Sequence, residues 1–249
     1  MNRVERAIIM AAGFGKRMQP ITLHTPKPLV KVNGVRMIDT VIRGLQENGI
    51  TEIYVVVGHL KEKFSVLEQE YPGLKLIENP YYDTCNNISS LYVAREYLEN
   101  AMILDGDQLV YNPEILAVEF ERSGYNCIWT EEKTDEWLLT EAQGVVTSCS
   151  RTGGEKGWQL YSVSRWSKED GQKLKQHLER EFEEKKNTQI YWDDVALFCY
   201  PQEYQLGIRQ MHRGDIVEID SLEELAELDE SYRKYVEGCL LYTSPSPRD

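Results

Sequence analysis

The sequence predicts an α/β protein with a doubly wound, mostly parallel sheet and a small antiparallel extension. Three short apolar runs, at residues 7–11, 53–57 and 101–104, each lead into a glycine or an Asp-Gly turn, as buried parallel strands do before a loop. Amphipathic helical patterns separate these runs. Because strand and helix alternate, we expect the functional site at the carboxyl ends of the strands.

The first half of the chain contains three predicted helices, at residues 37–48, 60–70 and 88–98. The first keeps its apolar residues on one face and stops at Gly49, a residue type that often terminates helices. The third follows the polar pair Asn86-Asn87. Together with the three strands, these helices make up the doubly wound core.

The second half continues with three strand-like runs, a long charged helix, a short strand and a final helix, at residues 126–130, 144–148, 158–164, 168–186, 218–221 and 222–228. The three runs predict the antiparallel extension. No flexible linker or internal repeat separates the halves, so we expect one domain over residues 1–238. Residues 239–249 contain Ser-Pro-Ser-Pro and are expected to be a disordered or non-native addition.

The composition predicts a soluble, reduced, cytoplasmic protein. Of the 249 residues, 41% are hydrophobic and 28% charged, the mean hydropathy is -0.49, and no apolar run approaches the roughly 18 residues that a membrane span needs. Five cysteines without a CxxC pair and four histidines without ligand spacing argue against a zinc site or a disulfide framework. The chain begins without the pattern of a secretory signal.

The charge of the chain is negative and unevenly distributed. The net charge of -13 argues against nucleic acid as a partner, because a phosphate polymer repels an acidic chain. Residues 1–31 nevertheless carry +5, which leaves -18 on the rest. A small basic segment on an acidic body indicates a small anionic ligand, although a solvated basic edge would give the same pattern.

A glycine-rich, basic loop follows the first predicted strand. It contains Gly13, Gly15, Lys16 and Arg17, so its backbone N–H groups could approach phosphate oxygens while the two cations neutralise them. The spacing fits neither the dinucleotide fingerprint, which needs a third glycine at the position of Met18, nor the P-loop, which needs Ser or Thr at the position of Arg17. A different type of phosphate loop is therefore indicated.

Other charged residues sit where a polyanionic ligand would need them. Lys27 lies between two prolines in a rigid turn, which indicates a second phosphate contact or a plain surface turn. Asp105 and Asp107 follow the third predicted strand and offer the hard oxygen ligands that Mg²⁺ prefers, although an ordinary Asp-Gly turn is the alternative. Asp220, before the final helix, is a further carboxylate or a helix N-cap.

The segments AAGFGKRMQPIT and TPKPLVKVNG closely resemble the N-terminal signature of bacterial nucleotidyltransferases, which join a nucleoside triphosphate to a small phosphate ester. The resemblance implies a Rossmann-like nucleotidyltransferase fold, with a nucleotide-binding core over about residues 1–125 and an acceptor-binding part over 126–238. It implies catalytic roles for Arg17 and Lys27 on the triphosphate, and Mg²⁺ held by Asp107 and Asp220. The residues expected to contact the nucleotide are Ala11, Ala12, Gly13, Gly15, Lys16, Asn86, Ser90 and Asp105.

One position departs from this signature. The family usually has Ser or Thr where this chain has Lys16, so the resemblance puts a hydroxyl contact in doubt and adds a cation.

Three further segments resemble the choline-phosphate cytidylyltransferases within this family: Asn86-Asn87-x-x-Ser90-Leu91-Tyr92, Glu136-Trp137-Leu138 and Tyr191-Trp192-Asp193. The likeness runs from about residue 6 to 229 and implies transfer of CMP from CTP to phosphocholine, forming CDP-choline and pyrophosphate. The implied acceptor-binding residues are Glu136, Trp137, Tyr191, Trp192 and Asp193. Aromatic faces and a carboxylate suit a cationic head group, but aromatic residues also pack cores.

Two features bear on the acceptor. Glu132-Lys133 is followed by Thr134 instead of the proline usual in sugar nucleotidyltransferases, which disfavours a sugar phosphate. The turn GGEKGW at residues 153–158 resembles a motif of 2-aminoethylphosphonate cytidylyltransferases, although a plain hairpin turn would explain it as well. A primary ammonium would give more weight to Glu136, Asp193 and Glu155.

A non-enzymatic alternative is a catalytically silent nucleotide-binding regulatory module. Such a module would lack a metal carboxylate or the lysine, and this chain has both. The sequence leaves open the acceptor, the choice of CTP over UTP, and the oligomeric state, a homodimer included.

Overall fold

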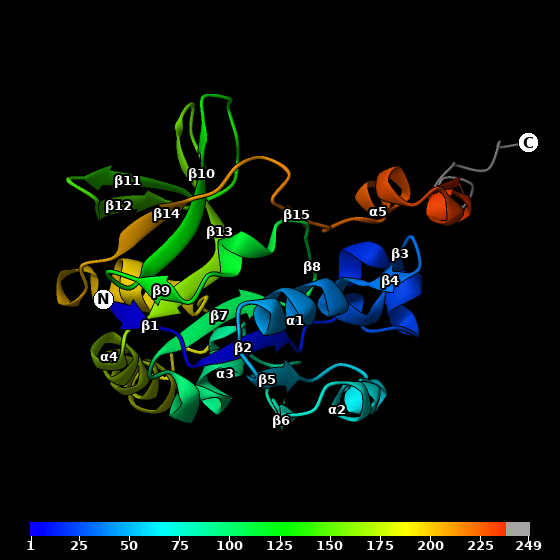
Figure 1. Ribbon diagram of the computed structural model, residues 1–249, viewed down its shortest axis with the longest axis horizontal. Helices are drawn as coiled ribbons and strands as arrows, with labels where there is room; N and C mark the ends of the chain where they lie inside the picture. Colours follow the sequence, from blue (N-terminus) through cyan, green and yellow to red (C-terminus); the bar gives the residue numbers. More distant parts are fainter. Residues whose placement is uncertain (238–249) are drawn as a thin grey trace, which may run out of the picture.

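The computed structural model describes residues 1–237 and has a nine-stranded mixed sheet at its centre (Figure 1). Four neighbouring strands run parallel in the order β7 (Ala101–Asp105), β2 (Arg6–Ala11), β5 (Glu52–Val57) and β6 (Leu74–Glu78). β13 (Gly157–Trp166) pairs antiparallel with β7 and so joins the second half of the chain to the same sheet. The prediction of a doubly wound α/β fold is confirmed.

The antiparallel extension is built on β13 and rises above the parallel strands in Figure 1. Its strands are β10 (Gly124–Thr130), β11 (Leu138–Ala142) and β12 (Val145–Ser150), and β14 (Gly207–Gln210) adds to β10 in parallel. Three two-stranded ladders complete the structure: β1 (Asn2–Arg3) with β9 (Glu119–Phe120), β3 (Lys31–Val32) with β4 (Val35–Arg36), and β8 (Gln108–Val110) with β15 (Ile216–Glu218).

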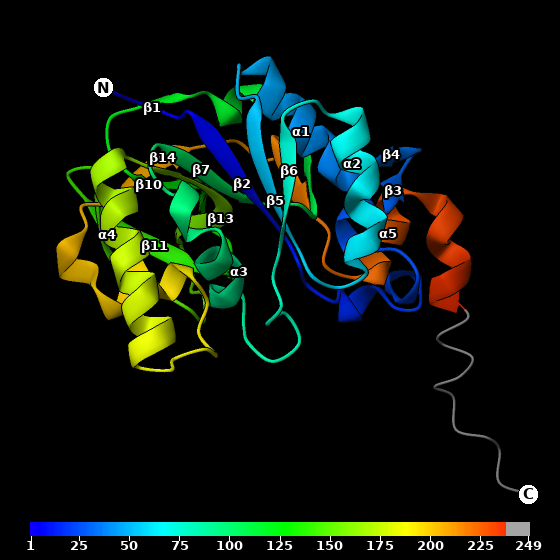
Figure 2. The same cartoon turned by 90° about the horizontal axis from the view of Figure 1, so that it is seen from below.

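Helices cover both faces of the parallel strands. The helices are α1 (Met37–Glu47), α2 (Ser65–Glu70), α3 (Ile88–Val93), α4 (Lys168–Glu179) and α5 (Leu222–Leu228). In β2, Ala7, Ile9 and Ala11 pack with α1, whereas Ile8 and Met10 pack with α3 and α4. Alternate residues of the strand thus enter two different cores, which is why the run is apolar throughout. Figure 2 shows α2 beside β6 and α4 at the other end of the sheet.

A third, smaller core connects the N-terminal loop to the C-terminal helix. Met18 and Met37 pack there with Ile219, Leu222 and Leu225, so α5 lies against the β3–β4 ladder (Figure 1). The antiparallel pairing of β15 with β8 holds the chain just before α5 next to the end of β7. Residues about 200 positions apart in sequence are therefore brought to one place.

The element boundaries differ from the prediction in three helices. Residues 61–70 form a 3-10 turn, Lys61–Phe64, followed by α2, while Leu60 has a φ of 51° and is outside the helix. The predicted helix 88–98 ends as α3 at Val93 and resumes only as a 3-10 turn, and the predicted helix 168–186 continues beyond α4 as a wider π-helical turn, Arg180–Glu184. The strands β6, β11 and β14 were not predicted.

Three predictions remain: those on the C-terminal segment, the domain division and membrane spans. The interpretation of residues 239–249 lies outside the described residues, and the division into one domain over 1–238 stays a prediction. Among residues 1–237, no helix combines the length and the apolar character that crossing a bilayer would require.

Candidate active site

The glycine loop after β2 forms a cavity of about 280 Å³ together with the residues around Lys27. The predicted site residues that line this cavity are Ala11, Gly13, Gly15, Lys16, Arg17, Lys27, Asp107 and Asp220. Gly15 has a φ of +60°, its carbonyl accepts a hydrogen bond from Thr22 Oγ1 at 2.8 Å, and an added Cβ would lie 2.9 Å from Thr22 Cγ2. The loop conformation therefore requires glycine at this position.

Lys27 lies at the centre of the charged part of the cavity. Its buried Nζ is 2.6 Å from Asp107 Oδ2 and 2.8 Å from Asp220 Oδ1, and the Arg17 guanidinium is 3.0 Å from Asp220. Burial opposes the charge of Lys27, but the two carboxylates outweigh it and hold the pKa of the ammonium above its usual value. Burial likewise opposes ionisation of Asp220, yet Lys27 and Arg17 hold its pKa below the usual range.

A group of carboxylates surrounds this lysine. Oxygens of Asp105, Asp107 and Glu218 lie within 4.8 Å of one another, and Asp220 is two residues after Glu218. Burial at the end of β7, followed by the charge of Asp107, raises the pKa of Asp105 to about 8. Carboxylates this close repel one another unless a cation lies between them. A set made only of hard oxygen donors fits Mg²⁺, so these three residues could hold the ion, with Asp220 close by on the other side of Lys27 Nζ.

Sequence reasoning missed Glu218. It occupies the last position of β15, one residue from Ile219, whose side chain is in the third core. Because side chains alternate along an extended chain, the pattern Glu218-Ile219-Asp220 places both carboxylates on the side opposite the core. This alternation was the signal available in the sequence.

The nucleotide-side residues outside the cavity have structural contacts. The Asn79 side chain donates hydrogen bonds to Ser89 Oγ at 2.9 Å and to the buried Ser90 Oγ at 3.0 Å. Asn86 Nδ2 donates to the Gln189 carbonyl at 3.1 Å, and the Ala12 carbonyl accepts from the His59 N–H at 3.1 Å. Nucleotide contacts by Asn86, Ser90 and Ala12 stay predictions.

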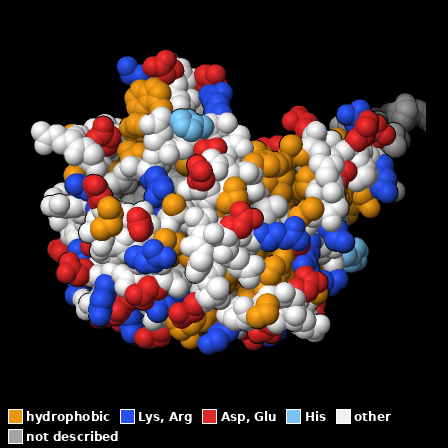
Figure 3. All heavy atoms as spheres, viewed as in Figure 1, with side chains coloured by type: hydrophobic (Ala, Val, Ile, Leu, Met, Phe, Trp, Pro, Cys, Tyr) orange, Lys and Arg blue, Asp and Glu red, His pale blue; other side chains and the backbone are white. Residues whose placement is uncertain are grey.

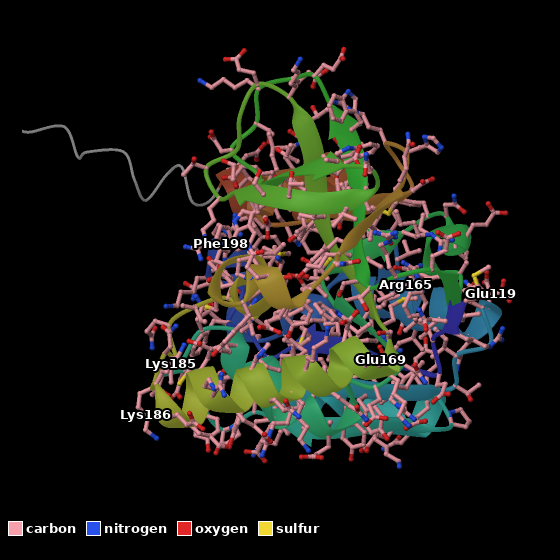
Figure 4. The ribbon with its side chains drawn as sticks, turned by 90° about the vertical axis from the view of Figure 1, so that its left-hand side faces the viewer. Glu119, Arg165, Glu169, Lys185, Lys186 and Phe198 are labelled. Atoms are coloured by element: carbon pink, nitrogen blue, oxygen red, sulfur yellow. The ribbon has the colours of Figure 1, made fainter. Side chains whose placement is uncertain are left out.

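On the acceptor side, three aromatic rings meet. Trp137 packs edge-to-face against Tyr191 at 5.7 Å and against Phe198 at 5.8 Å between ring centroids. The Arg151 guanidinium lies 3.9 Å from the centre of the Phe198 ring and 2.5 Å from Asp194 Oδ1. Phe198 is labelled in Figure 4, above Lys185 and Lys186 near the end of the α4 region. Phe198, Arg151 and Asp194 were not among the predicted site residues.

The predicted role of Trp192 needs correction. Its side chain is 2% exposed and packs edge-to-face on Trp166 at 6.0 Å in the core. Its ring is therefore not available to an acceptor, and the packing alternative holds for this residue. The next residue, Asp193, lies beside Tyr125, and burial raises the pKa of its carboxyl group to about 7.

Glu136, the residue before Trp137, lies beside the carboxylates. It lines a cavity of about 440 Å³ with Arg213, Glu218 and Asp220, and Asp220 also lines the cavity of the glycine loop. Figure 3 shows the outline of the molecule indented between the antiparallel strands and α5, where these elements face each other. A role of Glu136 in acceptor binding stays a prediction.

The glycine-rich turn at 153–158 has a structural explanation. Gly153 has a φ of +68°, and an added Cβ would lie 1.8 Å from the Thr134 carbonyl oxygen. Thr134 and Gly154 exchange backbone hydrogen bonds of 3.0 Å. The glycines therefore allow the hairpin between β12 and β13 to approach the chain before β11, while Glu155 is exposed.

Comparisons with known proteins agree with this geometry. Residues 7–178 match the model of the MobA-like NTP transferase domain. The chain is 38% identical to the 2-aminoethylphosphonate cytidylyltransferase of Lancefieldella rimae, over 91% of this chain and 92% of that protein. It is 32% identical to the choline-phosphate cytidylyltransferase of Streptococcus pneumoniae, over 90% of this chain and 97% of that protein.

Solved structures give the same result. The CTP:phosphocholine cytidylyltransferase of Streptococcus pneumoniae superimposes with a TM-score of 0.85 at 32% identity, covering 92% of this chain and 99% of that one. The inositol-1-phosphate CTP transferase of T. maritima reaches a TM-score of 0.73 at 18% identity, covering 95% of this chain and 98% of that one, and supports the fold alone.

Proposed function

The chain belongs to the MobA-like NTP transferase family and is a nucleotidyltransferase, and from this premise we propose that it transfers CMP from CTP to a small acceptor that carries a phosphate or phosphonate at one end and an amine at the other. The observation that carries the proposal is the convergence of the glycine loop, Lys27 and the carboxylate group on one cavity. The products would be the CDP-amine or its phosphonate analogue, and pyrophosphate.

The chemistry is an in-line displacement at the α-phosphorus of CTP. An acceptor phosphate or phosphonate oxygen forms the new P–O bond, the bond to the β-phosphate bridging oxygen breaks, and pyrophosphate leaves with that electron pair. No general base is required, because the acceptor oxygen is already largely ionised near pH 7. Catalysis then consists of positioning and charge neutralisation.

The residues of the cavity can supply both effects. Backbone N–H groups of the loop at Gly13 and Gly15 would bind triphosphate oxygens, and Arg17 and Lys27 would neutralise the charge that develops there. Bound Mg²⁺, held by Asp107 and Asp220 with Asp105 and Glu218 beside them, would supply further neutralisation of phosphate oxygens.

Two acceptors are supported by different observations. Phosphocholine, the acceptor that the sequence predicts, is supported by the aromatic rings of Trp137, Tyr191 and Phe198. 2-Aminoethylphosphonate is supported by the 38% identical relative that is named for it. The two differ in whether the cationic end can donate hydrogen bonds.

The test is pyrophosphate release by the full chain with Mg²⁺, with CTP and UTP each crossed against phosphocholine, phosphoethanolamine, 2-aminoethylphosphonate and glucose 1-phosphate. We expect turnover with CTP and an amine-bearing acceptor. A preference for glucose 1-phosphate would contradict the proposed acceptor class. Absence of turnover with every pair, while CTP still raises the melting temperature, would identify the regulatory module instead.

A further inference from the structure

A second cavity, of about 700 Å³, shares no lining residue with the cavity of the glycine loop. Its walls come from β9, β10, β13 and β14 and from the turn between β11 and β12. Cavities that bind small molecules usually measure about 300–1,000 Å³. The second cavity is therefore large enough for a small metabolite.

This cavity lies at the opposite end of β7 from the carboxylate group. Arg165, which lines it, pairs with Met102 near the start of β7, whereas Asp105 is the last residue of that strand. Figure 4 labels Arg165 and Glu119 beside each other, beneath the antiparallel strands. A ligand bound here would not contact the residues proposed to carry out the transfer.

Three neighbouring strands leave a hollow in the wall of the cavity. Gly124 of β10 is in register with Arg165 of β13 on one side and with Gly207 of β14 on the other. Asn126 and Arg209 form a further pair in register between β10 and β14. Residues in register project to the same face of a sheet, as do residues two apart on one strand. The two glycines therefore leave room between the side chains of Arg165 and Arg209.

Arg165 is a buried arginine whose polar partners are all neutral. Its side chain is 3% exposed. Its Nε donates to the Ala117 carbonyl at 2.9 Å, Nη1 donates to Asn126 Oδ1 at 2.6 Å, and Nη2 donates to the Ile115 carbonyl at 2.5 Å. Each terminal nitrogen has a further N–H, for which residues 1–237 provide no partner. A buried charge is normally paired, so a counter-ion is missing here.

Arg209 lies on the other side of the hollow and is half-buried. Its Nη1 donates to the backbone carbonyl of Glu119 at 3.1 Å, while the Glu119 carboxylate at the rim pairs with Arg3 at 3.7 Å. Burial lowers the pKa of Arg209, and burial followed by the charge of Arg209 lowers the pKa of Arg165 to about 9. Two guanidinium groups this close repel each other unless an anion lies between them.

The two arginines define the chemistry of the missing anion. Guanidinium groups bind phosphate and carboxylate oxygens through paired N–H donors, and phosphate sites favour arginine over lysine where this geometry matters. A phosphate group with one ester bond has a charge of about -1.5 to -2 near pH 7, which matches two uncompensated guanidinium groups. A single carboxylate would neutralise only one of them.

We propose that Arg165 and Arg209 bind the phosphate group of a small phosphate monoester, at a site separate from that of the transfer reaction. The phosphate lies over Gly124 and Gly207 and accepts hydrogen bonds from both guanidinium groups. The organic part of the ligand occupies the space toward the turn between β11 and β12, where Gln143 lines the cavity.

The test is calorimetric titration of the full chain with inorganic phosphate, glycerol 3-phosphate and succinate, in the absence of CTP. We expect both phosphates to bind, and succinate to bind at least about fivefold more weakly, because its two charges are on separate groups. Tighter binding of succinate than of either phosphate would overturn the proposed class of ligand.

Two variants test the cavity itself. Arg209→Gln removes one guanidinium charge and should weaken the binding of both phosphates about tenfold. Gln143→Glu adds a carboxylate of nearly the same shape at an exposed turn, and should weaken it about threefold through repulsion. Arg180→Gln removes an exposed arginine on the turn after α4 and is the matched control, which should leave binding unchanged.

Phosphate also suits the glycine loop, so each titration is repeated in the Arg17→Gln background. The loss caused by Arg209→Gln should persist there, because it belongs to the other cavity. Equal phosphate affinity in Arg209→Gln, Gln143→Glu and the unmodified chain would overturn the inference, and so would a loss that disappears in the Arg17→Gln background. These measurements do not depend on turnover, so the proposed function stands or falls separately.

Discussion

The nucleotide side and the acceptor side of the site differ in how their charges are balanced. On the nucleotide side, Lys27 and Arg17 pair with Asp107 and Asp220, so cations and carboxylates are in contact before any ligand binds. On the acceptor side, Asp194 pairs with Arg151, whereas Asp193 lies beside the Tyr125 hydroxyl group. The first arrangement must exchange partners to receive a polyanion, whereas in the second the protein's own arginine already neutralises one of the two carboxylates.

The two sides also differ in their framework. The nucleotide side is formed by loops at the carboxyl ends of parallel strands, where short motifs fix the backbone. The acceptor side is formed by turns around the antiparallel extension. There, neighbouring residues differ in burial: Trp192 is in the core, whereas Asp193 is partly exposed. Under the proposed function, the nucleotide side would carry the reaction and the acceptor side its selectivity.

The largest effect is expected from removing a carboxylate of the nucleotide side. Asp107→Ala should lower kcat by about a thousandfold or more, because the metal site and the partner of Lys27 are both lost. CTP binding, measured by calorimetry, should partly survive through the glycine loop. Glu169→Ala, which removes an exposed carboxylate on α4, is the control. Full activity of Asp107→Ala with Mg²⁺ would remove the metal assignment.

Lys27→Met tests the exchange of partners directly. The substitution keeps an apolar stem but leaves Asp107 and Asp220 without their buried ammonium, so kcat should fall about a hundredfold. Addition of Mg²⁺ should raise the melting temperature of this variant more than that of the unmodified protein. Lys31→Met removes an exposed lysine four residues away and should change neither quantity. Equal Mg²⁺ responses in all three proteins would argue against a shared cation position.

Gly15→Ala tests whether the loop backbone, as opposed to its charges, matters. A side chain there meets both a positive φ and the Thr22 methyl group, so we expect a loss of about 2 kcal/mol in the free energy of unfolding and weaker CTP binding. Gly34→Ala is the matched control, since Gly34 has a φ of +86° and no atom within 4 Å. An equal loss in both variants would mean that the Thr22 contact is irrelevant.

The smallest expected effect is on the pH dependence of stability, through His177 on the acceptor side. Burial lowers the pKa of His177 in α4, whose ring stacks on Tyr200 at 3.8 Å just after the turn that carries Phe198. Because the pKa in the folded state is below the unfolded value of about 6.5, this contribution to stability is present above that pH and is lost as the pH falls below it.

Urea unfolding between pH 7.5 and 5 would check this expectation. His177→Gln should show a smaller loss of stability on acidification than the unmodified protein. His24→Gln, at an exposed position, should behave like the unmodified protein. An identical pH dependence in all three would contradict a role for His177.

The nucleotide side could be predicted from the sequence because its residues are linked to local backbone signals. The apolar run of β2, the glycines of the following loop and the two prolines around Lys27 each indicate a position near a strand end, and the structure brings these residues together. Glu218 was missed because its place depends on the pairing of β15 with β8, a contact between segments about 100 residues apart.

The acceptor side was harder to predict for a physical reason. An aromatic residue is equally at home in a core and at a cationic ligand, and only packing decides between these roles. Trp192 enters the core with Trp166, while Trp137 stays half-buried beside Tyr191. Arg151 and Phe198 lie on the turn after β12 and on a π-helical turn, and no local pattern marks either as part of a site.

The third core has a consequence for the order in which the site is completed during synthesis. Lys27 and its partner Asp220 are 193 residues apart, and Ile219 and Leu222, on either side of Asp220, pack in the same core as Met18 and Met37. A nascent chain that already contains the whole parallel sheet therefore still lacks Glu218 and Asp220. In such a chain Lys27 could pair with Asp107 but not yet with Asp220. The capacity for turnover would arise only when the segment around β15 and α5 has left the ribosome and added Glu218 and Asp220 to the site.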